Sequence, residues 1–131
     1  MVDNDPEKSA RAVVEQWSTR ADRVVRVRYV CEPDPGISAA RNRAVDESED
    51  QSILAFIDDG ERPIDGWLDA LLATCLAEGA TGVVGPIEFR FAHKPESWII
   101  TGACFERRRL PTGSLVDVAA TNNLLLDLDF V

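Results

Sequence analysis

The residues best suited to chemistry stand where an apolar run stops. The run Ser52 to Ile57 ends in Asp58 and Asp59, and Gly60 and Glu61 follow. Its length and isoleucine content predict a buried strand of a parallel sheet. In open α/β sheets, ligands bind beyond the carboxyl ends of the strands. Paired acids there suit Mg²⁺ or Mn²⁺ with a phosphorylated ligand. Acids and glycine are also common in ordinary turns after a strand.

A second candidate is the segment from Gly36 to Asn42, which reads Gly-Ile-Ser-Ala-Ala-Arg-Asn. Glycine and alanine let a backbone approach a ligand closely, and a helix N-terminus favours anions. Arg41 has the donor geometry to bind a phosphate through two hydrogen bonds. Taken alone, the segment also fits a helix capped by Ser38 with an arginine on its surface.

The two segments together are more specific than either one. Glu32 to Asn42, then Phe56 to Leu68, then Thr121-Asn122-Asn123 follow one another in the order typical of one family. Pro63, Trp67 and Leu68 have the expected spacing after the acids. The combined pattern resembles the family 2 glycosyltransferases over nearly the whole chain.

The resemblance implies a transferase that uses a nucleotide-diphospho-sugar donor and an unknown hydroxyl acceptor, on a Rossmann-like α/β sheet. In that family, acids at the end of the central strand bind ribose and a divalent metal, and a later carboxylate is the general base. By match, the donor-binding positions are Asp3, Gly36, Arg41, Asn42 and Asp58, the metal ligands are Asp58 and Asp59, and Asn122 and Asn123 border the acceptor.

Two departures from the family pattern concern the chemistry. The usual motif is Asp-x-Asp, and Gly60 stands at the third position. Alternate residues of a strand share a face, so Asp59 replaces the lost carboxylate only if the chain turns there. Asp127 and Asp129 follow the asparagines too closely to match the family's base. The sequence therefore predicts weakened binding of Mg²⁺ or Mn²⁺, and little or no transfer by this chain alone.

A further departure concerns the fold. The family's first strand, helix and second strand precede the acid that Asp3 resembles. We therefore expect one partial domain over residues 1–131, truncated at both ends, in which the first βαβ segment is missing. A truncated reading frame, a degenerate copy and a piece of a larger enzyme all fit. Strands that lose their partners expose open edges, which makes self-association plausible.

Apolar periodicity places the elements around these motifs. Gly79 and the capping residues Ser38 and Asp65 set the expected helix ends. Expected helices cover 7–19, 39–45 and 67–76. Expected strands cover 24–30, 52–57 and 83–91, the last bent at Gly85-Pro86, with further strands, or a strand leading into a helix, over 98–105 and 116–126. The alternation of helix and strand indicates an α/β fold.

Composition excludes several classes of protein. The chain has 131 residues and a formal net charge of −9, which argues against nucleic acid as the main partner. The first residues lack a basic start followed by an apolar stretch, so we expect no secretory leader, and no apolar run reaches the roughly 20 residues that cross a membrane. The odd set Cys31, Cys75 and Cys104 suits reduced thiols in the cytoplasm.

Two alternatives concern partners. A non-catalytic acidic α/β binding or interaction module stays open, but a phospho-receiver domain is disfavoured because Lys8 and Lys94 do not end apolar strands. The basic run 107–109 fits a solvated turn, with phosphate or an anionic lipid surface as its alternative ligand.

Overall fold

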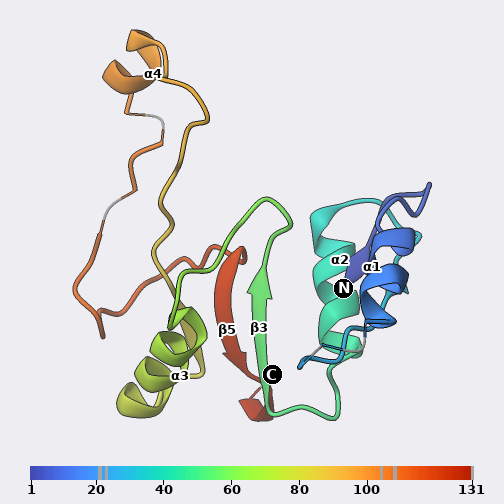
Figure 1. Ribbon diagram of the computed structural model, residues 1–131. Coiled ribbons are helices and arrows are strands. Elements are labelled where there is room, and N and C mark those ends of the chain that lie inside the picture. Colours follow the sequence, from blue (N-terminus) through green and yellow to red (C-terminus); the bar gives the residue numbers. More distant parts are fainter. Residues whose placement is uncertain (21, 23, 104, 108, 131) are drawn as a thin grey trace. The chain divides into compact units, whose positions relative to one another are not determined.

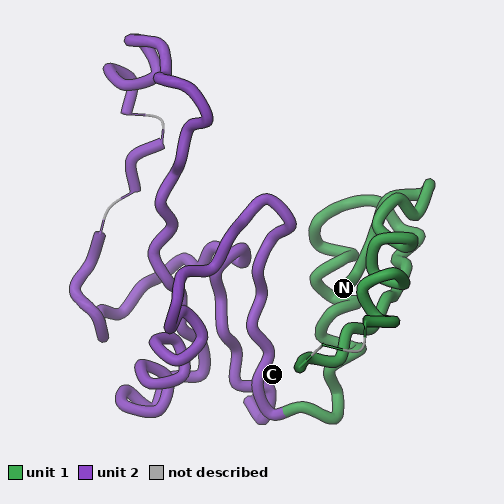
Figure 2. Tube along the Cα trace, viewed as in Figure 1, with its two compact units in different colours: residues 1–51 green, residues 52–131 purple. Residues whose placement is uncertain are grey.

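The computed structural model describes residues 1–20, 22, 24–103, 105–107 and 109–130. These residues divide into two compact units (Figures 1 and 2), an N-terminal unit of residues 1–51 and a C-terminal unit of residues 52–131. Helices and strands alternate in both, so the chain is a mixed α/β structure with small sheets. Among the described residues, no helix combines the length and the apolar character that crossing a bilayer requires.

The N-terminal unit is a short parallel strand pair with two helices. In chain order its elements are β1 (Val2–Asp3), α1 (Arg11–Ser18), β2 (Val30–Cys31) and α2 (Ile37–Asp46). Strand β1 pairs with β2 in parallel, Val2 opposite Val30. Backbone bonds from Val30 N to Met1 O and from Glu32 N to Asp3 O, both 2.9 Å, hold the pair. The carboxyl ends of β1 and β2 therefore lie at the same edge.

Three local expectations for this unit are wrong. Helix α1 begins at Arg11 rather than at residue 7, because Lys8 has a φ of 57° that no right-handed helix accommodates. The strand expected over 24–30 is reduced to Val30–Cys31, since its partner β1 has only two residues to pair with. Ser38 lies inside α2, and Gly36 is the residue that precedes the helix.

The C-terminal unit is built on an antiparallel sheet. Its elements are β3 (Ile53–Ile57), α3 (Trp67–Glu78), β4 (Gly82–Val84), α4 (Ser97–Thr101), β5 (Asn123–Asp127) and a 3₁₀ turn (Leu128–Phe130). The strand order is β3-β5-β4, with β5 antiparallel to both neighbours. The core of the unit forms where α3 meets the sheet: Leu125 is fully buried, and Leu71 and Cys75 of α3 pack with it.

Several expectations for this unit also fail. Strand β3 is where the sequence places it, but it pairs antiparallel with β5 and its terminal isoleucines are 38% and 39% exposed. No strand forms over 87–91, residues 97–101 are helical, and the last strand begins only at Asn123. Gly66 rather than Asp65 precedes α3, whereas Gly79 ends it in the left-handed conformation as expected. Cys31 and Cys75 are free thiols; Cys104 lies outside the described residues.

Candidate functional site

The acidic motif forms a tight turn directly after β3. Glu61 N donates to Asp58 O at 3.1 Å, which places Asp59 and Gly60 at the two central positions. Asp58 is half-buried and Asp59 is exposed. The chain therefore turns at Asp59 and Gly60. Such a turn is the condition under which Asp59 can replace the carboxylate missing at position 60.

The antiparallel register brings the Thr-x-Asn segment beside this turn. Ile57, the last residue of β3, lies opposite Asn123, the first residue of β5. The preceding residue, Asn122, donates from Nδ2 to a carboxylate oxygen of Glu61. Two motifs about sixty residues apart in the sequence are therefore joined by a side-chain hydrogen bond. The sequence places Glu61 in the acidic segment, and the structure adds its contact with Asn122.

Asn123 has a different environment, inside the unit. Its side chain is 8% exposed. Trp67 Nε1 donates to Asn123 Oδ1 at 2.8 Å, and Asn123 Nδ2 donates to Pro86 O at 3.0 Å. Both ends of the amide are thus engaged, as buried polar groups require. We call these three residues the Asn123 clamp, because they tie the start of β5 to α3 and to the chain after β4.

Gly85 makes the space that the clamp occupies. Gly85 N donates to Asn123 O at 3.0 Å. A Cβ atom at Gly85 would lie 2.4 Å from Asn123 Nδ2 and 2.8 Å from its Cγ, well inside contact distance. The sequence shows Gly85-Pro86 as a bend, but the requirement for glycine comes from a side chain 38 residues later.

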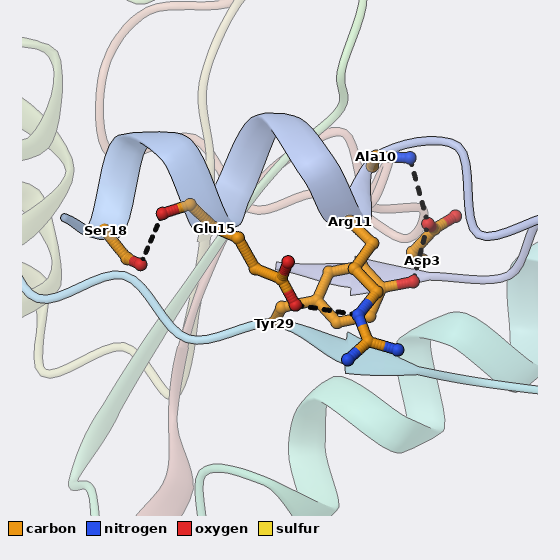
Figure 3. A network of polar contacts seen from close by, with 6 residues as sticks. All are labelled: Asp3, Ala10, Arg11, Glu15, Ser18 and Tyr29. Atoms are coloured by element: carbon orange, nitrogen blue, oxygen red, sulfur yellow. Dashed lines mark hydrogen bonds and ion pairs between the residues drawn. The ribbon is translucent and has the colours of Figure 1, made fainter.

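Asp3 organises the N-terminal unit (Figure 3). It is 7% exposed, and its carboxylate accepts hydrogen bonds from Ala10 N at 3.2 Å and from the Tyr29 hydroxyl at 2.9 Å, both drawn in Figure 3. Asp5 N is a third donor, at 3.0 Å. These bonds fold the loop between β1 and α1 back onto the strand end. A buried carboxylate held by three donors is a rigid group at the carboxyl edge of the strand pair.

The start of α2 is tied to the same edge. Asn4 Nδ2 donates to Gly36 O at 3.0 Å. Gly36 has φ 116° and ψ 153°, a combination essentially limited to glycine. The structure therefore brings Asp3 and Gly36 together through Asn4, a contact that the sequence did not indicate. One turn further along α2, Arg41 is half-buried and Asn42 is exposed.

The Tyr29 hydroxyl gives a spectroscopic readout of this arrangement, because Tyr29 is the single tyrosine of the chain. Partial burial, and then the hydrogen bond to Asp3 and its charge, raise the pKa of Tyr29 to about 12. The folded value exceeds the unfolded value of about 10. The stability that the neutral phenol contributes is therefore complete below about pH 10, and it is lost as the pH rises through about 12.

We expect a spectrophotometric titration of the phenolate band to give a midpoint near 12 for the folded protein and near 10 in urea. Asp3→Asn should lower the folded midpoint, because it removes the neighbouring negative charge. A folded midpoint near 10 would show that the Asp3–Tyr29 contact does not persist in solution.

The acidic turn has the ligand chemistry of a hard divalent cation. Carboxylate oxygens suit Mg²⁺, which needs only one or two of them when substrate phosphates and water complete its shell. Asp58 and Asp59 match that requirement in kind. Within the part of the chain that the structure describes, no three His, Cys, Asp or Glu side chains converge on one point.

Comparison with known proteins agrees with the pattern of motifs. Residues 1–127 match the family model described as glycosyl transferase family 2. The succinoglycan biosynthesis protein ExoM of Rhizobium meliloti (strain 1021) is 38% identical over 102 residues, which cover 78% of this chain and 32% of that relative. The chain thus spans about a third of the relative's length. No solved structure matches the chain.

Proposed function

Because this chain belongs to glycosyl transferase family 2, we propose that it takes part in transferring a sugar from a nucleotide-diphospho-sugar donor to an acceptor hydroxyl. The family implies a Rossmann-like α/β fold, and the alternating helices and strands agree with it. The observation that carries the proposal is the acidic turn at the end of β3, which the Asn122–Glu61 hydrogen bond joins to the start of β5.

Five residues bind the donor in this proposal. The family places the donor's base near an acid at the position of Asp3, whose carboxylate is held in place by three donors of the N-terminal unit. Arg41 provides a cation for the diphosphate. The full donor set is Asp3, Gly36, Arg41 and Asn42 of the N-terminal unit and Asp58 of the C-terminal unit.

Asp58 and Asp59 hold the divalent cation in this proposal, either Mg²⁺ or Mn²⁺. When bound, such a cation neutralises charge on the departing nucleoside diphosphate. The half-buried position of Asp58 suits a ligand shared between ribose and metal. Asp59 is exposed at a central position of the same turn, where its carboxylate is available to the cation.

The acceptor side is assigned to Asn122 and Asn123 by family match, with different tasks. Asn122 borders the turn through Glu61, whereas the Asn123 amide is used inside the unit. The acceptor hydroxyl must lose its proton to a base as its oxygen bonds to the sugar. No carboxylate of this sequence has the family's spacing for that base, so we expect residues 1–131 alone to bind donor without turning it over.

Calorimetry with a panel of nucleotide-diphospho-sugars tests the proposal. We expect one of them to bind in the presence of Mn²⁺ with a Kd within about 1 μM to 1 mM, the range in which enzymes commonly hold substrates. Arg41→Ala should weaken that binding about tenfold, since it removes a charge-assisted contact with phosphate.

Arg26→Ala is the matched control, because Arg26 is an exposed arginine of the same unit outside the proposed donor set. It should bind donor like the unchanged protein. If a folded chain binds no donor with or without Mn²⁺, the non-catalytic binding module replaces the transferase as the better interpretation.

A further inference from the structure

An aromatic cluster lies on the segment between β4 and β5. Residues 86–103 leave the sheet and carry α4 at their far end, and 105–107 with 109–110 lie on the way back toward β5 (Figure 1). The Phe105 ring meets Phe89 edge-on, with centroids 5.1 Å apart, and meets Phe91 at 5.4 Å. The rings line a groove of about 190 Å³ with Ile99 and Ile100. We call residues 86–110 the aromatic arm.

Much of this apolar surface faces solvent. Trp98 is 65% exposed, Ile100 56%, and the three phenylalanines of the cluster 40–44%. Soluble proteins rarely leave large side chains grouped in this way unless the patch binds something. These exposed side chains all belong to the aromatic arm.

The charge of the aromatic arm is opposite to that of the rest of the chain. It contains five Lys and Arg against three Glu, a net charge of +2, whereas the other residues contain nine Lys and Arg against twenty Asp and Glu, a net charge of −11. The Arg107 guanidinium lies 5.7 Å from the Phe89 ring centre, and Arg90 and Lys94 are exposed. Aromatic and cationic side chains are therefore interspersed on the arm.

We propose that the aromatic arm docks on an anionic lipid surface. Tryptophan and phenylalanine side chains with neighbouring cations are the combination that binds at the headgroup level of a bilayer. The cations of the arm face the lipid phosphates, which attract them. A purely apolar partner would leave the grouping of cations unexplained. The proposal does not depend on donor binding.

Sedimentation of the full chain with lipid vesicles tests this. We expect binding to vesicles containing phosphatidylglycerol, weak binding to pure phosphatidylcholine, and loss of binding as salt rises, since salt screens surface charges. The double variant Arg90→Glu and Arg107→Glu should reduce binding at least tenfold, because each cation near the surface contributes a factor of about five.

The double variant Lys8→Glu and Arg26→Glu is the matched control. It makes the same change in net charge at exposed residues of the N-terminal unit, and it should reduce binding far less. For the apolar contribution, Trp98→Ala should weaken binding, whereas Trp17→Ala, which removes a 42% exposed tryptophan of α1, should not. Circular dichroism verifies that each variant is folded.

Three results would overturn the proposal: no vesicle binding at low salt, equal binding to neutral and anionic vesicles, or equal losses in the arm and control variants. Concentration-dependent self-association that Trp98→Ala abolishes would identify the arm as an interface between two copies instead. Analytical ultracentrifugation without lipid separates that outcome.

Discussion

Replacing Asn123 by alanine is expected to lower the free energy of unfolding by about 2–4 kcal/mol. The substitution leaves Trp67 Nε1 and Pro86 O without their partners and opens a small cavity where the amide was 8% exposed. A polar group buried without a partner costs about 1–3 kcal/mol, a cost that applies to Trp67 Nε1 rather than to the carbonyl of the exposed Pro86. Urea titrations followed by tryptophan fluorescence and by circular dichroism measure the change.

Asn122→Ala is the matched control, one residue away. Asn122 is half-buried, and within the described part of the chain its side chain bonds to Glu61 alone, so the expected loss is about 1 kcal/mol or less. Equal losses for the two variants would mean that the Asn123 clamp does not hold the C-terminal unit together.

A double-variant cycle with Gly85 tests the geometry of the clamp. Gly85→Ala alone forces a methyl group against the Asn123 amide and should cost about 1–3 kcal/mol. In the Asn123→Ala background the methyl group has space. The double variant should therefore lose about 1–2 kcal/mol less than the sum of the single losses. Simple additivity would contradict the close approach of the two residues.

Asp58→Asn is expected to weaken donor binding in Mn²⁺ roughly 10- to 100-fold while leaving the fold intact. The change keeps the shape of the side chain but removes the negative charge that the proposed metal and ribose contacts need. Binding measured without metal should change much less. Calorimetry with and without Mn²⁺ gives both values.

Asp65→Asn provides the control for that experiment. Asp65 is an exposed carboxylate in the turn before α3, and replacing it by asparagine removes the same charge as Asp58→Asn does. It should leave the affinity unchanged. If Asp58→Asn binds donor like the unchanged protein, or if Asp65→Asn loses as much affinity, the donor does not use the acidic turn.

Local patterns located most of the helices and the central acidic motif. The apolar stripe of α1 and the glycine after α3 are short-range signals, and α2, α3 and β3 lie close to their expected positions. Strand pairing was harder to predict. The alternation in Val24 to Val30 indicates a strand, but a ladder is only as long as its partner, and β1 offers two residues. An apolar run such as β3 likewise gives no direction for its neighbour, which is antiparallel here.

By itself the sequence determined the family and the order of its motifs, because the residue types and their spacing along the chain carry that information. The tertiary structure decided what the polar side chains do. Trp67 and Asn123 are 56 residues apart, and Asn123 and Pro86 are 37 apart. Such partners meet only after the antiparallel register is set, so a buried clamp and a bordering asparagine look alike in the sequence.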